Sequence, residues 1–187
     1  MQNAVPKGEG CMLAVLGSKV EIIESLLNEN KNNFIAQIAN DNSEGQIVLS
    51  GRISDIEKLI QVLKSKNIKN VKLPVSAPFH CKLMSNATDI MRNEIGKLNF
   101  LDSKNKLISN VTAKEISNME ELKILLIDQV ENRVRWRESG VHMINNGVNH
   151  FIEIGPGKVL SGLIKRIDKN VKINTINNRS DIKDLEL

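Results

Sequence analysis

The segment FIAQIANDNSEGQIVLSG, residues 34–51, decides the fold of the first part of the chain. Two apolar runs, FIAQIAN and GQIVLSG, flank the polar turn sequence DNSEG, which predicts either a hairpin-like connection or two neighbouring strands. The strand-like CMLAVLG and a helical pattern from Ser18 precede this pair, and a helical pattern from Ser54 and the strand-like VKLPV follow it. This order predicts a ferredoxin-like βαββαβ small domain over residues 10–75.

Both predicted helices of this domain begin with Ser-x-x-Glu. The pairs are Ser18 with Glu21 and Ser54 with Glu57. This spacing is typical of a capping box, in which the serine side chain accepts a hydrogen bond from the backbone at the start of the helix.

From residue 76 to residue 187 the pattern alternates between longer helices and isolated strands. The strands are expected at KLISNV, at a buried HFIEI and at KINTI, and the helices near Lys82 and over residues 119–130, 134–146 and 158–167. The last helix is expected to turn five side chains inward: Val159, Leu160, Leu163, Ile164 and Ile167. Alternation of this kind predicts a parallel α/β sheet, but about three strands fall short of the usual five or six. We therefore expect a partial sheet whose other strands lie upstream.

The composition reduces the classes of function that the chain could have. The net charge of +4 is spread among acids, which favours a solvated surface over an acidic macromolecular partner. Two cysteines and three histidines show neither a disulfide framework nor zinc spacing, so no metal is expected. There is no run long enough to span a bilayer and no signal pattern, so we expect a cytoplasmic protein without a membrane partner.

Three motifs bear on chemistry. His80, in the loop SAPFHC at the junction of the two parts, is a candidate catalytic residue because clefts between domains bind ligands, although a lone loop histidine is more often structural. GPGKVLSG lacks the spacing of a nucleotide-binding loop, so its glycines are read as turn residues. The nucleophile elbow G-x-S-x-G is absent, and Cys81, adjacent to His80, is poorly placed to act as its nucleophile.

Four blocks together carry a family resemblance: GQIVLSG, KLPVSAPFHCKLM, a Gln129 shortly before Val134 and Trp136, and FIEIGPGKVLSGLIKR. In order and spacing they resemble the malonyl-CoA:acyl carrier protein transacylase family along essentially the whole chain. The resemblance implies an α/β-hydrolase-like large domain interrupted by a ferredoxin-like small one. Residues 76–187 would then be the C-terminal portion of the α/β acyltransferase domain.

The resemblance also assigns roles to residues. His80 takes the place of the catalytic base, and the backbone carbonyl of Gln129 would orient it, in keeping with the unpaired carbonyls at a helix end. Asn40 and Asn42 would face the cleft, toward pantetheine or carrier protein, with a turn-forming role as the equal alternative. Phe79 would lie beside the α-carbon of the acyl group, unless it is a core residue at the domain junction.

The implied reaction belongs to fatty acid biosynthesis. A Ser/His ping-pong mechanism transfers malonyl from malonyl-CoA to the phosphopantetheine thiol of acyl carrier protein without a cofactor. This chain would supply the histidine, while the serine and a carboxylate-binding arginine would lie upstream of Met1, with a separately encoded N-terminal half as one source.

The chain alone is therefore expected to be inactive. An inactive fragment or a carrier-protein-binding module is the alternative function. RNA binding ranks last, because the four small-domain strands offer only Phe34 for base stacking.

Overall fold

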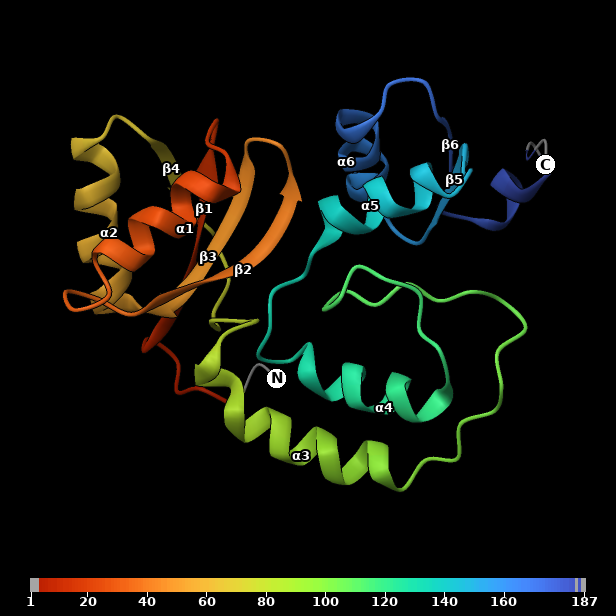
Figure 1. Cartoon of the computed structure of the whole chain (residues 1–187), viewed down its shortest axis with the longest axis horizontal. Helices are drawn as coiled ribbons and strands as arrows, with labels where there is room; N and C mark the ends of the chain where they lie inside the picture. The colour runs from red at the N-terminus through yellow and green to blue at the C-terminus, as the bar shows by residue number, and fades with distance from the viewer. Residues whose placement is uncertain (1–3, 184, 186–187) are drawn as a thin grey trace.

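The fold is a mixed α/β arrangement, seen in a computed structural model that describes residues 4–183 and 185 (Figure 1). The first unit contains β1 (Gly10–Leu16), α1 (Val20–Glu29), β2 (Ala36–Ser43), β3 (Gln46–Arg52), α2 (Ile53–Ser65) and β4 (Lys69–Lys72). Its strands form one antiparallel sheet in the order β2-β3-β1-β4. The βαββαβ order expected from the sequence is present.

The core of this unit lies between the sheet and its two helices. Alternate residues of β1, among them Leu13 and Val15, are fully buried against α1 and α2, as a strand with a period of two requires. Met12 points to the opposite face, where it packs with Ala39 and Val48. The helix side of the core holds Cys11, Leu13, Val15, Val20, Ile23, Leu26, Phe34, Ile47, Leu49, Ile56, Leu59 and Leu63.

The turn between β2 and β3 is shorter than the DNSEG sequence predicts. Ser43 pairs with Gln46, so only Glu44 and Gly45 lie in the turn, and Gly45 has a φ of 74°. Two register shifts, between Ile38 and Asn40 and between Asp41 and Ser43, let the polar residues remain within β2. The asparagines of this stretch are therefore strand residues, and the turn-forming alternative for them is wrong.

Both predicted capping boxes are wrong. α1 begins after Lys19 and α2 after Arg52, and neither start has a side-chain cap. At α2 the chain passes directly from strand to helix, because Arg52 still pairs with Gly10 and the N–H of Ile53 donates to the carbonyl of Glu9 at 2.9 Å. The N–H of Ile53, at the start of α2, is therefore satisfied by a backbone carbonyl and not by a serine side chain.

The second unit is mainly helical. It contains η1 (Lys82–Met84), α3 (Ser85–Gly96), α4 (Met119–Asp128), α5 (Trp136–Asn145), β5 (His150–Ile154), α6 (Val159–Ile167), β6 (Lys172–Ile176) and η2 (Arg179–Ile182). β5 and β6 form a two-stranded parallel sheet, paired from His150 with Lys172 to Ile154 with Ile176. Among the described residues, none of the helices combines the length and the apolar character that a membrane crossing requires.

The strand predicted at KLISNV is wrong. Residues 106–111 make only a single bridge, between Ile108 and Glu115. Residues 109–114 form hydrogen bonds with one another. The N–H of Ser109 donates to the carbonyl of Lys114, and the N–H of Ala113 donates to the carbonyl of Ser109, both at 2.9 Å. The segment therefore forms a compact loop in place of a strand.

The second unit leaves apolar side chains uncovered. Of the side chains expected to turn inward on α6, Leu163 and Ile164 are buried, but Val159 is 71% exposed and Leu160 is also exposed. Ile154, at the end of the supposedly buried β5, is 78% exposed. The prediction of a buried face at the β5–α6 junction is thus wrong for the described residues.

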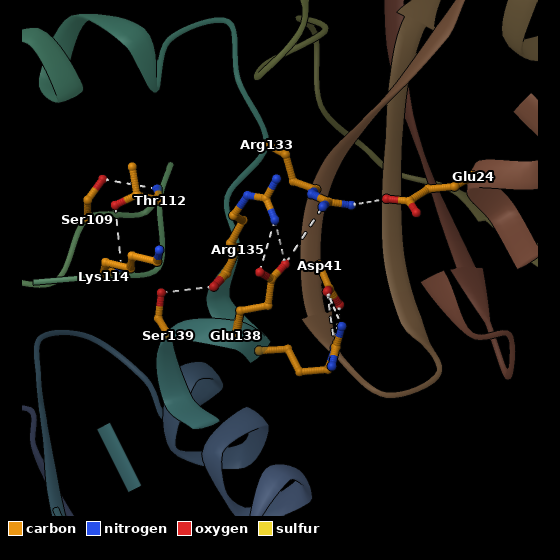
Figure 2. A network of polar contacts seen from close by, with 10 residues as sticks. Glu24, Asp41, Ser109, Thr112, Lys114, Arg133, Arg135, Glu138 and Ser139 are labelled. Atoms are coloured by element: carbon orange, nitrogen blue, oxygen red, sulfur yellow. Dashed lines mark hydrogen bonds and ion pairs between the residues drawn. The ribbon is translucent and has the colours of Figure 1, made fainter. Parts of the chain in front are cut away.

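The two units are joined along the free edge of β2. Val134 lies beside this strand: its N–H donates to Ala39 at 2.8 Å, and its carbonyl accepts from Asp41 at 2.9 Å. Asp41 is 1% exposed, and its carboxylate accepts hydrogen bonds of 2.8 to 3.1 Å from Nε and Nη2 of Arg137. Hydrogen bonding to Asp41 raises the pKa of Arg137, outweighing burial, which lowers it. Figure 2 shows Asp41 here, with Arg133 reaching Glu24 nearby.

We expect Arg137→Ala to lower the free energy of unfolding by about 3–5 kcal/mol, because it leaves a buried carboxylate without its partner. The double variant Asp41→Leu/Arg137→Met should recover much of the loss, since it removes both charges together. Urea unfolding of the chain measures both. The control is Arg92→Ala, which breaks the exposed pair with Asp89 and should cost less than about 1 kcal/mol. A cost for Arg137→Ala as small as the control's would contradict this account of the joint.

Candidate active site

His80 lies in the loop that connects β4 to η1, where the first unit meets the second. Its φ of 58° is in the left-handed region, which is uncommon for a residue other than glycine. Pro78, two residues before His80, is fully buried and packs against Gly10, which anchors the loop to β1. A Cβ at Gly10 would lie 2.3 Å from Cγ of Pro78, so glycine is needed for this close approach.

The imidazole of His80 contacts the end of α4. Its Nδ1 lies 2.7 Å from the backbone oxygen of Gln129, the C-cap residue of that helix. A carbonyl can only accept, so Nδ1 carries a proton and donates it, which leaves Nε2 as the ring nitrogen able to take up a proton. The structure therefore brings together the two residues that the sequence named as catalytic, although their roles stay predictions.

Asn110 also reaches Gln129 and was not anticipated from the sequence. Its Nδ2 donates to Oε1 of Gln129 at 3.2 Å, and its backbone oxygen accepts from the N–H of Arg135 at 2.8 Å. Asn110 belongs to the compact loop that contains Ser109, Thr112 and Lys114, drawn in Figure 2. Asn110 was missed because the sequence pattern placed it in a strand at KLISNV, where its side chain was given no role.

The predicted substrate residues lie on both sides of the junction. Phe79 is half-buried and packs against two apolar clusters, one around Met84 and one around Met12. These contacts support the core interpretation of Phe79 and do not test its contact with substrate. Asn40 and Asn42 are half-buried on β2, next to Val134 and in alternation with the buried Ala39, Asp41 and Ser43.

Comparison with known proteins identifies the relatives of this chain. No family model matches it. The malonyl CoA-acyl carrier protein transacylase of Staphylococcus aureus (strain MRSA252) is 41% identical over 188 residues, covering 98% of this chain and 60% of the relative. That of Bacillus subtilis (strain 168) is 37% identical over 189 residues, covering 100% of this chain and 59% of the relative. The chain is homologous to the malonyl CoA-acyl carrier protein transacylases. It spans about 60% of the length of these curated relatives.

Solved transacylases have the same fold over the matched part. The enzyme from Clostridium perfringens superimposes with a TM-score of 0.92 at 36% identity, covering 98% of this chain and 58% of that one. A malonyl transacylase solved with a type II polyketide synthase acyl-carrier protein gives a TM-score of 0.90 at 32% identity, covering 97% and 59%. Transacylases of this family are enzymes of fatty acid synthesis.

Cys81 is not arranged as a nucleophile in this transacylase homologue. The residue is 1% exposed, and its Sγ donates to the carbonyl of Pro78 at 3.1 Å. Burial raises the pKa of the Cys81 thiol, which keeps it in the protonated, unreactive form. Among the described residues, no group of three or more His, Cys, Asp or Glu side chains could hold a metal ion.

The GPGKVLSG segment is a capped helix start. Glu153 of β5 accepts hydrogen bonds from the N–H of Leu160 at 3.1 Å and of Ser161 at 2.7 Å. A carboxylate of the chain thus occupies the backbone donors that a phosphate would use. Burial raises the pKa of Glu153, but the hydrogen bonds from Ser161 and its neighbours lower this pKa by a larger amount. The pKa of Glu153 therefore lies below its usual range.

We expect Glu153→Ala to lower the free energy of unfolding by about 1 kcal/mol at pH 7, the usual scale of a lost cap. A lowered pKa in the folded state means that this stabilisation is complete above the unfolded value, about 4.3, and disappears as the pH falls through the folded value. The difference between variant and wild type should therefore shrink in acid. Urea unfolding at pH 7 and at about pH 3 tests this, with Glu120→Ala, which removes an exposed carboxylate paired with Lys123 in the first turn of α4, as the control. A difference that is constant with pH would contradict the role of the carboxylate.

Proposed function

We propose that this chain is the histidine-bearing, C-terminal part of an acyl carrier protein S-malonyltransferase. The observation that carries the proposal is the 2.7 Å contact between Nδ1 of His80 and the Gln129 carbonyl, in a chain homologous to these enzymes. Residues 10–75 are then the ferredoxin-like small domain. Residues 76–187 are the C-terminal portion of the α/β-hydrolase-like acyltransferase domain, which works in the cytoplasm.

The reaction proceeds in two halves around Nε2 of His80. Nε2 takes the proton from a serine hydroxyl as its oxygen attacks the thioester carbon of malonyl-CoA, and returns that proton to the departing coenzyme A thiolate. The phosphopantetheine thiol of acyl carrier protein then gives its proton to Nε2 and attacks the malonyl-serine ester. The C–O bond breaks, and the serine recovers the proton. Throughout, the Gln129 carbonyl holds Nδ1–H and stabilises the charged ring.

The serine of this reaction comes from polypeptide outside the 187 residues. The sequence contains no G-x-S-x-G elbow. The uncovered Ile154 and Val159, at the β5–α6 junction, support a missing partner segment, because parallel sheets are buried on both faces. The absent part, encoded separately or with this chain, would add strands beside β5 and β6 and supply the arginine for the malonyl carboxylate.

A second candidate is a carrier-protein-binding module without catalysis. The missing elbow favours it, and a relative has been solved in complex with an acyl-carrier protein. Under this proposal His80 would be dispensable for the activity of the chain, and activity measurements separate the two candidates.

The test joins this chain to the part of the Staphylococcus aureus relative that it does not match. The joined protein should transfer malonyl from coenzyme A to carrier protein, and His80→Ala should lower transfer by about two to four orders of magnitude. The chain alone should show no transfer. The control is His142→Ala, which removes a ring from α5 far along the chain and should leave the rate unchanged.

Two results would overturn the proposal. A joined protein that folds and transfers malonyl equally well with His80→Ala would remove the histidine from the mechanism. Turnover by the chain alone that depends on His80 would place the nucleophile within these residues. Carrier-protein binding by the joined protein without any transfer would favour the module.

Phe79→Ser tests the expected position of Phe79 beside the α-carbon of the acyl group. If the ring occupies the space of an α-methyl group, the substitution should raise the methylmalonyl-to-malonyl ratio of kcat/KM by roughly 10- to 200-fold at most. If Phe79 only packs the junction between its two clusters, the ratio should stay constant while the Tm falls. The ratio in the joined protein decides between these outcomes.

A further inference from the structure

Asn110 connects the two ends of the segment that carries the His80 acceptor. This segment, residues 129–135, runs from the C-cap of α4 to the N-cap of α5. The Asn110 side chain donates to the Gln129 side chain at one end, and its backbone oxygen accepts from Arg135 at the other. One residue thus fixes both ends of the connection.

The loop that holds Asn110 is itself firmly built. Ser109 is buried, and its Oγ accepts from the N–H of Val111 at 3.1 Å and of Thr112 at 3.4 Å. Two backbone hydrogen bonds of 2.9 Å, Ser109 to Lys114 and Ala113 to Ser109, close the loop, and Ala113 has a φ of 56°. Asn110 therefore contacts Gln129 from a loop that is closed by its own hydrogen bonds.

The position of Gln129 matters because its carbonyl meets His80 at the C-terminal end of a helix. The last carbonyls of a helix have no intrahelical partner, so their direction depends on what holds the final residue. α4 itself has no buried side chain, and the packing at its end comes from Val130, the residue after Gln129, which is buried in the cluster around Met84. The hydrogen bond from Asn110 to Oε1 adds a direct restraint on Gln129 itself.

We propose that Asn110 is a positioning residue of the site. Its amide holds Gln129 so that the backbone carbonyl faces Nδ1 of His80, which keeps the ring in the Nδ1–H tautomer and leaves Nε2 free. The catalytic consequence rests on the proposed function, but the positional effect is a property of the imidazole and can be measured without any reaction.

The experiment observes the histidine rings of the whole chain by ¹⁵N NMR at neutral pH. In the wild type, His80 should show a protonated Nδ1. Asn110→Ala should reduce the Nδ1–H share and raise exchange of this proton with water by roughly two- to tenfold, the equilibrium factor of one net hydrogen bond. His150, whose Nε2 lies 2.7 Å from Oδ1 of Asn174, is an internal reference that should not change.

Further variants separate positioning from general loosening. Gln129→Ala removes the amide but keeps the carbonyl, so it should match Asn110→Ala, and the double variant should be no worse than either. Asn110→Asp should remain near the wild type, because the Gln129 amide can turn and donate to the carboxylate. The matched control is Asn118→Ala, which removes the cap at the other end of α4 and should leave His80 unchanged.

The proposal is overturned if His80 is unaffected by Asn110→Ala, if the two alanine effects add, or if Asn118→Ala has the same effect. If Asn110→Ala fails to fold, Gln129→Ala and Asn110→Asp still decide the matter through the same ring. In the joined protein, a tautomer shift caused by Asn110→Ala, with no malonyl transfer by the wild type, would support the positioning role and reject the proposed function. Malonyl transfer by the wild type, with no tautomer shift in Asn110→Ala, would support the proposed function and reject the positioning role.

Discussion

The pairing of Val134 with the edge of β2 is the constraint on which the site depends. His80 follows the first unit, whereas Gln129 comes 49 residues later, at the end of α4. The two meet because the chain beyond Gln129 returns to β2, where two backbone hydrogen bonds and the Asp41–Arg137 pair fix it. The geometry of the imidazole is thus set by this contact between units together with packing inside the second unit, where Val130 is buried beside Met84.

This joint depends on a buried charge, which is a costly way to hold two surfaces together. Burying Asp41 removes its carboxylate from water, and the bidentate guanidinium of Arg137 compensates for the lost hydration. An apolar pair of the same volume could be as stable, but it would slide more easily. The fork of Arg137 accepts only one orientation of the carboxylate, so the ion pair fixes the register of α5 on β2.

The sequence predicted elements well where a local period determines them. The βαββαβ order and most helices of the second unit follow from apolar spacing, which is a property of neighbouring residues. The predictions from the sequence failed where backbone groups form hydrogen bonds that no local pattern indicates. Examples are Ser18 and Ser54, which were expected to cap helices and do not, and the segment KLISNV. The contact of His80 with Gln129 was anticipated only through the family resemblance. The contacts of Asp41 with Arg137 and of Asn110 with Gln129 join distant segments, and no local pattern announces them.

The use of a backbone carbonyl as the partner of His80 has a consequence for how the site is encoded. A triad with a carboxylate depends on one acidic side chain, which can be found in a sequence and removed by one substitution. Here every residue has a carbonyl, so the identity of residue 129 matters less than the direction in which its peptide group points. That direction is determined by the helix end, by the Asn110 loop and by the docking of Val134 on β2. The orienting group of the proposed site is therefore distributed over the fold, which is why structural residues such as Asn110 and Arg137 belong to the description of the proposed chemistry.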